Sequence, residues 1–397
     1  MNANVHVAGA GLISAIGNSV LESLHALQND RSGIGPLTLF ESIHGHLPVG
    51  EVKLSNRALA EKLNLSLTYP RAALLGIHAA REAVRDSGIP FLAKWRTGLI
   101  SATTVGGMDN TENFFPHFLK NTSSGRLRDV IHHSCGSSTE LIADDLGING
   151  FISTVNTACS SSVNSIIFAT RLIREGILDV AVAGGTDALT RFTLNGFNSL
   201  MILDKQPCRP FDAHRNGLNL GEGAGFLVLV SGKVVREEKI KSTSRVAGHG
   251  NANDAFHQTA SSPEGRGSYS AMMGALKVGG LKTADIGYIN MHGTGTLNND
   301  LSEATAIKRL FGDDTPKLSS TKGFTGHTLG ASGGIEAVFS SLALTERCVF
   351  SNPGFVTPMP EVNIIPQRHY SAENLAHVMS NSFGFGGNCS AIIFSKN

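Results

Sequence analysis

The chain has 397 residues, of which 41% are hydrophobic and 16% charged, with 33 basic and 32 acidic side chains giving a net charge of +1. This length exceeds one simple core, so two domains or a duplicated unit are expected. The near-zero charge argues against a nucleic-acid or membrane-surface partner. No stretch approaches the roughly 18–20 apolar residues of a membrane span.

Cysteine usage and the amino terminus bear on the compartment. The five cysteines, at 135, 159, 208, 348 and 389, are widely spaced and form no CxxC pair, so neither a zinc site nor a disulfide framework is indicated. The first nine residues carry no basic residue ahead of their apolar run, which argues against a secretory signal. We therefore expect a cytoplasmic protein with no metal site.

The first half alternates strand-like and helix-like segments. A strand at 5–11 ends in a glycine turn, amphipathic helices follow at 19–29 and 69–87, and a strand follows at 97–103. The pattern breaks down over 105–150, which we interpret as an insertion that covers a site, with His132 and His133 as surface residues. The remaining segments are a buried strand at 151–155, a helix after Cys159 that ends near Gly176, and strands at 180–183 and 223–230.

The second half repeats this order. Residues 246–250 echo 7–11, and a helix at 268–278 leads to a strand at 286–291 that matches the strand at 97–103. Residues 317–321 and a helix at 333–344 match the strand and helix on either side of Cys159. The last correspondence is between 377–381 and 180–185. Apolar strands without alternation favour parallel sheets that are covered on both faces. We predict two α/β halves, at 1–235 and 236–397, whose equivalent loops converge on one site.

Cys159 lies at the turn between a predicted strand and a predicted helix. The free N–H groups and the positive dipole at a helix start favour a thiolate, so we expect a thiol that is more acidic than a free one. A buried structural cysteine is the alternative interpretation of this stretch. The turn alone does not decide between the two.

Two glycine-flanked histidines follow strand ends in the second half. His292 begins an HGTGT segment, and His327 follows Lys322 on a glycine-rich loop that precedes a helix. A single histidine is most often an ordinary polar residue. Two of them, at places equivalent to that of a cysteine in the other half, indicate a catalytic site.

The motifs together resemble the β-ketoacyl-acyl carrier protein synthases, decarboxylating condensing enzymes of the thiolase superfamily. The resemblance covers essentially the whole chain and implies a duplicated thiolase-like fold, with two mostly parallel sheets and helices in α-β-α-β-α layers. Its motifs are NTACSS at 156–161, RPFD at 209–212, GEGAG at 221–225, HGTGT at 292–296, Lys322 with Gly326 and His327, and NSFGFGG at 381–387.

The residue chemistry agrees with that resemblance. A cysteine can hold an acyl group as a thioester and then release it, which suits Cys159. Two neutral imidazoles, His292 and His327, can donate N–H bonds to a thioester oxygen while CO2 leaves, and the charge of Lys322 would help to keep them neutral. No cofactor is expected.

The resemblance assigns further roles. It implies that the backbone N–H groups of Cys159 and Phe385 bind the oxyanion during acyl transfer, and that Phe385 also acts as a gate. It makes Glu336 the acidic partner of Lys322, for which a purely structural ion pair is the alternative. The implied substrate-binding residues are Phe197, Phe383, Thr294 and Thr296.

The implied partner is an acyl carrier protein with phosphopantetheine-linked substrates, and a homodimer is the default assembly. The basic run expected for carrier docking is thin, with only Arg71 near the 70–87 helix, and Asn216 and Cys389 replace the family's usual Asp and Asn. Segments 195–200 and 298–300 are similar to condensing enzymes of specialised polyene pathways, which suggests a heterodimer as the alternative.

Three competing functions remain. A degradative thiolase would use a second cysteine, and Cys389 raises that alternative, but Thr328 follows His327 where thiolases have proline. An acetyl-CoA-primed synthase would have asparagine at position 327. A non-catalytic chain-length subunit would normally lack the cysteine that is present at 159.

Overall fold

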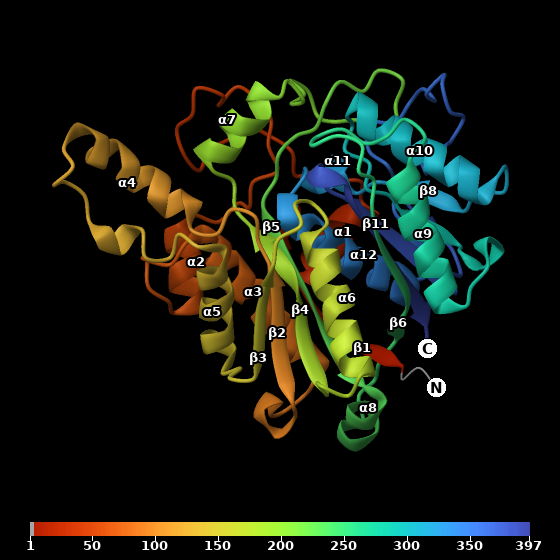
Figure 1. Ribbon diagram of the computed structural model, residues 1–397, viewed down its shortest axis with the longest axis horizontal. Coiled ribbons are helices and arrows are strands. Elements are labelled where there is room, and N and C mark those ends of the chain that lie inside the picture. The colour runs from red at the N-terminus through yellow and green to blue at the C-terminus, as the bar shows by residue number, and fades with distance from the viewer. Residues whose placement is uncertain (1–3) are drawn as a thin grey trace.

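The computed structural model describes residues 4–397 and contains one large sheet (Figure 1). Its strand order is β3-β2-β4-β5-β1-β6-β12-β11-β7-β8. Strands at the same distance from the two edges of the sheet, such as β3 and β8, hold equivalent places in the two halves. The predicted repeat is therefore visible as a mirrored strand order. The strands are β1 Val5–Ser14, β2 Thr97–Ala102, β3 Phe151–Val155, β4 Val180–Asp187, β5 Gly223–Ser231, β6 Ser244–Asn253, β7 Tyr288–Asn290, β8 Lys317–Ser319, β11 His377–Phe383 and β12 Asn388–Lys396, with the short pair β9 Cys348–Val349 and β10 Ser371–Ala372 apart from them.

Parallel pairs lie toward the two edges and antiparallel pairs lie in the middle. The strand β2 runs parallel to β3 and β4, and β7 runs parallel to β8 and β11. The central strands are antiparallel, and only three residue pairs join β1 to β6, where the two halves meet. The carboxyl ends of the parallel strands therefore carry the loops in which the sequence predicts the site.

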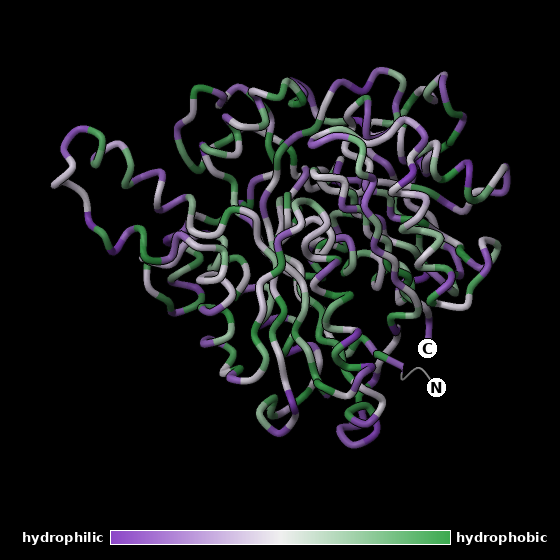
Figure 2. The backbone as a smooth tube through the Cα atoms, in the orientation of Figure 1, coloured by the Kyte–Doolittle hydropathy of each residue, from purple (hydrophilic) through white to green (hydrophobic). Residues whose placement is uncertain are grey.

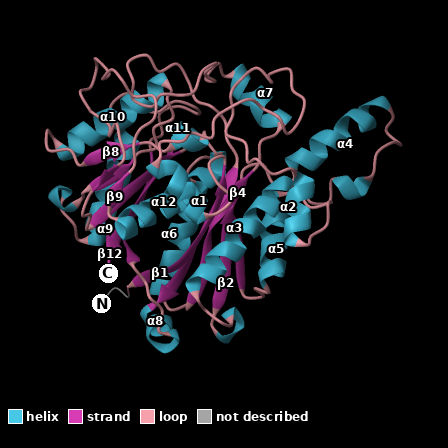
Figure 3. Cartoon of the chain, turned by 180° about the vertical axis from the view of Figure 1, so that it is seen from behind, coloured by secondary structure: helices cyan, strands magenta, loops and turns pink. Residues whose placement is uncertain are grey.

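The helices form three layers around these strands (Figures 1 and 3). Helices α6 (Ser161–Arg174) and α12 (Ser332–Glu346) lie between the halves and contact strands of both. Outer layers are formed by α3 and α5 on the first half and by α9 and α10 on the second. This is the expected α-β-α-β-α arrangement, and the predicted α/β thiolase-like fold class is confirmed. The two sheets expected from the resemblance are joined through β1 and β6 into one ten-stranded sheet.

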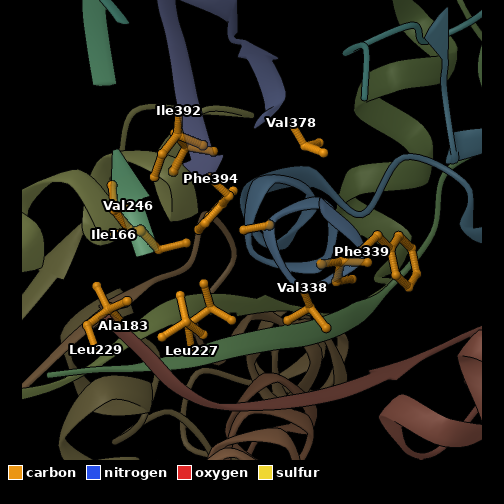
Figure 4. Packing of buried hydrophobic residues seen from close by; sticks show 14 of the residues in the cluster. Ile166, Ala183, Leu227, Leu229, Val246, Val338, Phe339, Val378, Ile392 and Phe394 are labelled. Carbon is orange, nitrogen blue, oxygen red and sulfur yellow. The ribbon is translucent and has the colours of Figure 1, made fainter. Parts of the chain in front are cut away.

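The core fills the space between the halves. Figure 4 shows Ile166 of α6 and Val338 of α12 between Leu227 of β5 and Ile392 of β12. The hydropathy colouring of Figure 2 shows hydrophobic residues concentrated along the central strands. Because α12 is apolar on nearly every side, 12 of its 15 residues are buried.

The predicted helices begin and end with ordinary capping residues. The Ser19 hydroxyl accepts a hydrogen bond from the N–H of Glu22 at the start of α1, and Gly88 ends α3 at φ +65°. The helices not yet given are α1 Val20–Gln28, α2 Asn56–Leu63, α3 Arg71–Ser87, α4 Met108–Lys120, α5 Cys135–Leu146, α7 Arg191–Ser199, α8 Gly232–Glu238, α9 Arg266–Gly279, α10 Leu297–Phe311 and α11 Lys322–Thr325, with 3-10 turns η1 to η5 at 92–94, 127–129, 283–285, 329–331 and 385–387.

Two sequence-based expectations are wrong. The strand β3 is not buried: it lies at the edge of the sheet, and Phe151 and Ile152 are 36% and 41% exposed. The 105–150 region does not cover the site either, since it contains α4 and α5 and α4 projects away from the body (Figure 1). Short apolar runs do not distinguish an edge strand from a central one, because burial depends on which strands pair beside them.

Candidate active site

The loops of both halves meet at a cavity of about 370 Å³. Cys159 comes from the turn between β3 and α6, His292 from the loop after β7, and His327 from the loop between α11 and α12. The donor atoms of these three side chains all lie within 4.8 Å of one another, and all three residues are buried. The predicted convergence of the two halves on Cys159 is therefore present in the structure.

The turn that carries Cys159 is tightly constrained. Ala158 has φ +54°, in the left-handed region that L residues rarely occupy, and α6 begins at Ser161. Gly384 from the second half packs against this turn, since a Cβ there would lie 2.8 Å from the carbonyl oxygen of Thr157. Glycine is required at 384 because any side chain would separate the two segments.

The Cys159 thiol is not acidic in the resting structure, contrary to the expectation from the helix start. Burial raises the pKa of Cys159 to about 11, although Lys322 and the backbone N–H groups of Phe385 and Cys159 favour the thiolate. The loss of water around the sulfur outweighs these favourable groups. The thiol therefore needs a nearby proton acceptor when it reacts.

His327 is in place to take that proton. Its Nε2 lies 3.1 Å from Cys159 Sγ, and its Nδ1 lies 2.9 Å from the hydroxyl of Ser332. A hydroxyl can donate or accept, so Ser332 suits either neutral tautomer of the ring. Burial, reinforced by the charge of Lys322, holds the pKa of His327 well below its usual value, so the ring is neutral at pH 7.

Lys322 fixes the tautomer of His292. The Lys322 Nζ lies 3.2 Å from His292 Nδ1 and 2.7 Å from its carbonyl oxygen. Because an ammonium group only donates, Nδ1 must accept and the ring proton must lie on Nε2. Burial and the charges of Lys322 and His327 lower the pKa of His292 well below its usual value. His292 is therefore a neutral N–H donor.

The Lys322 ammonium is paired with Glu336 in the interior. The two side chains form a salt bridge, and both are almost fully buried. Burial raises the pKa of Glu336 to about 7, an effect that the charge of Lys322 opposes. The pair lies next to His292, so it serves the site as well as the core.

Glu303 on α10 supports the His292 loop and was missed in the sequence. Its carboxylate accepts the backbone N–H groups of His292 at 3.0 Å and Gly293 at 2.9 Å, and the side-chain amide of Asn381 at 3.0 Å. Asp300, one turn earlier, accepts the N–H groups of Thr294 and Gly295. Asp300 and Glu303 are three residues apart and so share one helix face. Their spacing directly after the HGTGT segment is a sequence signal that could have identified them as supports of this loop.

Asp187 at the end of β4 was also missed. It accepts the backbone N–H of Gly330 at 2.7 Å, three residues after His327, and the hydroxyls of Thr103 and Thr104. A single acid after a strand gives no such signal, because its partners come from distant segments.

The predicted substrate-binding residues all line the cavity. The rings of Phe197 and Phe385 stack at 5.8 Å with an interplanar angle of 17°, and Phe383 packs against His292. The hydroxyls of Thr294 and Thr296 are 2.9 Å apart and also line the cavity. The cavity lining thus includes both aromatic rings and hydroxyl groups.

The same site offers the donor types of a zinc centre. A thiol and two imidazoles within 4.8 Å of one another form a three-ligand set. The ammonium of Lys322, 3.2 Å from His292 Nδ1, opposes a divalent cation at this place. The arrangement therefore favours acyl chemistry over metal binding.

Cys389 and Arg71 do not take part in the site. The Cys389 thiol is buried against Ser268, 4.0 Å from its hydroxyl, and does not line the cavity that holds Cys159. Arg71, the one basic residue noted near α3 for carrier docking, is buried in a salt bridge with Glu222. The thiolase alternative thus lacks its second cysteine, and Arg71 is not available as a docking residue.

No helix formed by residues 4–397 combines the length and the hydropathy needed to cross a membrane.

Models of known protein families match both halves of the chain. The sequence model of the beta-ketoacyl synthase N-terminal domain matches residues 2–234, and that of the C-terminal domain matches residues 243–355. The chain is 34% identical to 3-oxoacyl-[acyl-carrier-protein] synthase 2 of Staphylococcus aureus (strain COL), over 100% of this chain and 99% of the relative. It is 31% identical to the protein of the same name from Vibrio cholerae, over 99% of both chains.

Solved structures give the same result. The ishigamide ketosynthase/chain length factor superposes with a TM-score of 0.93 at 29% identity, over 100% of both chains. A ketosynthase in complex with its chain length factor from Xenorhabdus doucetiae superposes with a TM-score of 0.86 at 30% identity, over 100% of this chain and 98% of the other. With both halves matched and its cysteine and two histidines gathered in one cavity, the chain belongs to the β-ketoacyl synthase family.

Proposed function

We propose that the chain is a 3-oxoacyl-acyl carrier protein synthase that joins an acyl group on Cys159 to a malonyl unit with loss of CO2. The observation that carries this proposal is the position of Cys159 Sγ 3.1 Å from His327 Nε2, with a ring nitrogen of His292 within 4.8 Å of both side chains. The nucleophile comes from the 1–235 half, and both histidines come from the 236–397 half.

In the first step, the Cys159 sulfur attacks the carbonyl carbon of an acyl thioester. His327 accepts the thiol proton, and the backbone N–H groups of Cys159 and Phe385 bind the oxyanion of the tetrahedral intermediate. The C–S bond to the carrier breaks, and the acyl group remains on Cys159. The carrier thiolate takes from His327 the proton that came from the Cys159 thiol.

In the second step, a malonyl thioester occupies the side of the cavity that Thr294 and Thr296 line. The Nε2–H groups of His292 and His327 bind its thioester oxygen as the bond to the carboxylate breaks and CO2 leaves, with His327 now in the tautomer whose Nδ1 accepts from the Ser332 hydroxyl. The electron pair forms an enolate, whose carbon attacks the Cys159 thioester. The new carbon–carbon bond forms, the cysteine thiolate leaves and takes up a proton from water, and the carrier holds a 3-oxoacyl chain that is two carbons longer.

Phe385 regulates access between these steps. Its ring lies on Phe197 and sits on a loop in which Gly386 and Gly387 both have positive φ values. Glycine gives this loop the freedom to move the ring aside when the second substrate arrives. The acyl chain would then lie against Phe197.

A second chain completes the assembly in this proposal. The edge strand β3 exposes Phe151 and Ile152, and the 105–134 arm exposes further apolar side chains, among them Leu119 and Leu127. An exposed apolar edge strand is prone to pair with another chain. A homodimer is the default, and a heterodimer with a chain length factor is the alternative that the two superposed structures favour.

The five free cysteines suit a reducing compartment, and we propose a cytoplasmic location on that ground. The substrate carrier is an acyl carrier protein, as in the names of the curated relatives. A specialised polyene or polyketide pathway, rather than primary fatty acid synthesis, is the second candidate, because the superposed structures include chain length factor complexes.

A panel of acyl carrier proteins of different chain length and saturation tests the proposal. The enzyme is incubated with each acyl carrier protein and malonyl carrier protein, and the carrier products are weighed. A 3-oxoacyl product two carbons longer supports the proposal. A panel that yields no elongated product, with the chain alone and with a chain length factor added, refutes it.

A further inference from the structure

A cluster of polar side chains joins the two halves beside Cys159. The Oδ1 atom of Asn388 accepts hydrogen bonds from the hydroxyl of Ser160 at 2.8 Å and from the side-chain amides of Asn164 and Asn251, both at 2.9 Å. Ser160 follows Cys159 directly, Asn164 lies on α6, and Asn251 lies on β6. One acceptor atom therefore holds three donors from both halves of the chain.

The backbone of Asn388 closes the loop that carries Phe385. The N–H of Gly384 donates to the carbonyl oxygen of Asn388 at 2.8 Å, and the N–H of Gly387 donates to Gly384 at 3.1 Å. The loop is glycine-rich, so it has little rigidity of its own. Its position depends on what holds its two ends.

Asn388 thus bonds to both segments that supply the oxyanion donors. Its side chain bonds to the nucleophile turn through Ser160, and its backbone bonds to the Phe385 loop through Gly384. The separation of the N–H groups of Cys159 and Phe385 depends on how these two segments pack. The histidines are held by other residues, namely Glu303, Lys322 and Ser332.

We propose that Asn388 is a positioning residue for acyl transfer, which sets the spacing of the backbone N–H groups of Cys159 and Phe385. The inference rests on the proposed condensing function and adds a residue that the reactions at the Cys159 acyl carbonyl need and that decarboxylation does not. The acceptor oxygen is the important atom, because the Nδ2 of Asn388 has only a 3.5 Å contact with Asn251.

The test compares Asn388→Leu with Asn388→Asp, which have nearly the same size but differ in whether an acceptor remains. With the acyl carrier protein that acylates the wild type fastest, we expect Asn388→Leu to acylate Cys159 about 10- to 100-fold more slowly, as expected for donors that are misplaced rather than removed. The KM for the carrier should change less than twofold. Asn388→Asp should stay within about fivefold of the wild type.

Decarboxylation of malonyl carrier protein separates positioning from general damage. Its rate should fall less than about threefold in Asn388→Leu, because the histidines keep their own supports. Alkylation of Cys159 by iodoacetamide, mapped by mass, gives a readout that needs no acyl substrate. The pH midpoint of alkylation should move upward in Asn388→Leu, since two N–H groups that favour the thiolate are displaced.

Asn251→Ala is a second variant that keeps the proposal testable if Asn388→Leu does not fold. Asn251 is exposed, and its side-chain amide donates to the same Oδ1 atom of Asn388. Acylation should slow about three- to tenfold in Asn251→Ala, the effect of one lost donor to that oxygen, and it should be unchanged in the exposed control Asn149→Ala. The proposal is wrong if Asn388→Leu acylates Cys159 within twofold of the wild-type rate, or if Asn388→Asp acylates as slowly as Asn388→Leu. It is also wrong if decarboxylation in Asn388→Leu falls as much as acylation, or if Asn251→Ala acylates at the wild-type rate. Failure of the wild type to acylate or decarboxylate would instead refute the proposed function.

Discussion

His327 Nε2 lies 3.1 Å from Cys159 Sγ, which brings the proposed proton acceptor from one half against the proposed nucleophile of the other. Burial raises the pKa of the thiol to about 11 and lowers that of the imidazole, so the resting pair is neutral. Reaction then requires the proton to move as the sulfur attacks. A thiolate that exists before substrate binds is not needed in this account.

The two histidines should differ when each is removed. Both His292→Ala and His327→Ala should lower decarboxylation of malonyl carrier protein by about 100-fold or more, the usual cost of one oxyanion donor. Acyl-Cys159 should remain detectable by intact mass in both variants. Acylation should be slower in His327→Ala than in His292→Ala, because only His327 lies within bonding distance of the sulfur. Equal acylation rates in the two variants would contradict the role of His327 as proton acceptor.

Lys322 should control the acid limit of decarboxylation. Burial, reinforced by the positive charge of Lys322, lowers the pKa of His292 and His327, so both rings stay neutral, and able to accept or donate as required, into acidic solution. Replacing the buried pair together, as Lys322→Met with Glu336→Gln, avoids leaving one charge unpaired. The pKa of both rings should rise, and the loss of activity at low pH should move to higher pH. An acid limit at the same pH as the wild type would contradict this role.

Glu303 should be needed to hold His292. Glu303→Ala leaves the N–H groups of His292 and Gly293 without an acceptor, which costs about 1–3 kcal/mol for each buried group. We expect a lower Tm and slower decarboxylation, with Cys159 acylation less affected. Exposed Glu264→Ala is the control. A normal decarboxylation rate in Glu303→Ala would show that the loop holds its shape without the carboxylate.

Glu303 should also shape the dependence of stability on pH. Burial raises its pKa to about 7, above the ordinary value of 4.5, so the folded state keeps a proton that the unfolded state has already released. This group therefore makes the free energy of unfolding fall as pH rises from about 4.5 to 7. Glu303→Gln cannot titrate and should flatten this part of the curve, measured by urea unfolding at several pH values. An unchanged slope would contradict the raised pKa.

The edge strand β3 should carry the contact with a second chain. Ile152→Lys places a charge on the exposed edge and should shift the protein toward a monomer in analytical ultracentrifugation. Exposed Ile43→Lys, outside any strand, is the matched control. A dimer of undiminished affinity in Ile152→Lys would locate the contact elsewhere.

The repeat could be predicted from the sequence because apolar runs are local signals. The strand ends could not, since β1 and β4 continue through Gly11 and Gly184, where glycine turns were expected, to Ser14 and Asp187. The same local signals could not show that β3 lies at an edge or that 105–150 projects away from the site, since both depend on which segments pack beside them. The acidic Cys159 thiol was predicted from a helix start, but the helix begins two residues later and burial outweighs the dipole. Asn388 and Asp187 each have a partner more than 100 residues away, Ser160 and Gly330, which no spacing in the sequence indicates.

The most direct test is to weigh the enzyme through one cycle of reaction. With acyl carrier protein alone, the wild type should gain one acyl mass that maps to Cys159, and Cys159→Ala should gain none. Addition of malonyl carrier protein should remove that mass, with one CO2 and one 3-oxoacyl carrier protein formed for each acyl group. An acyl mass on another residue, or one on Cys159 that malonyl carrier protein does not discharge, would contradict the account.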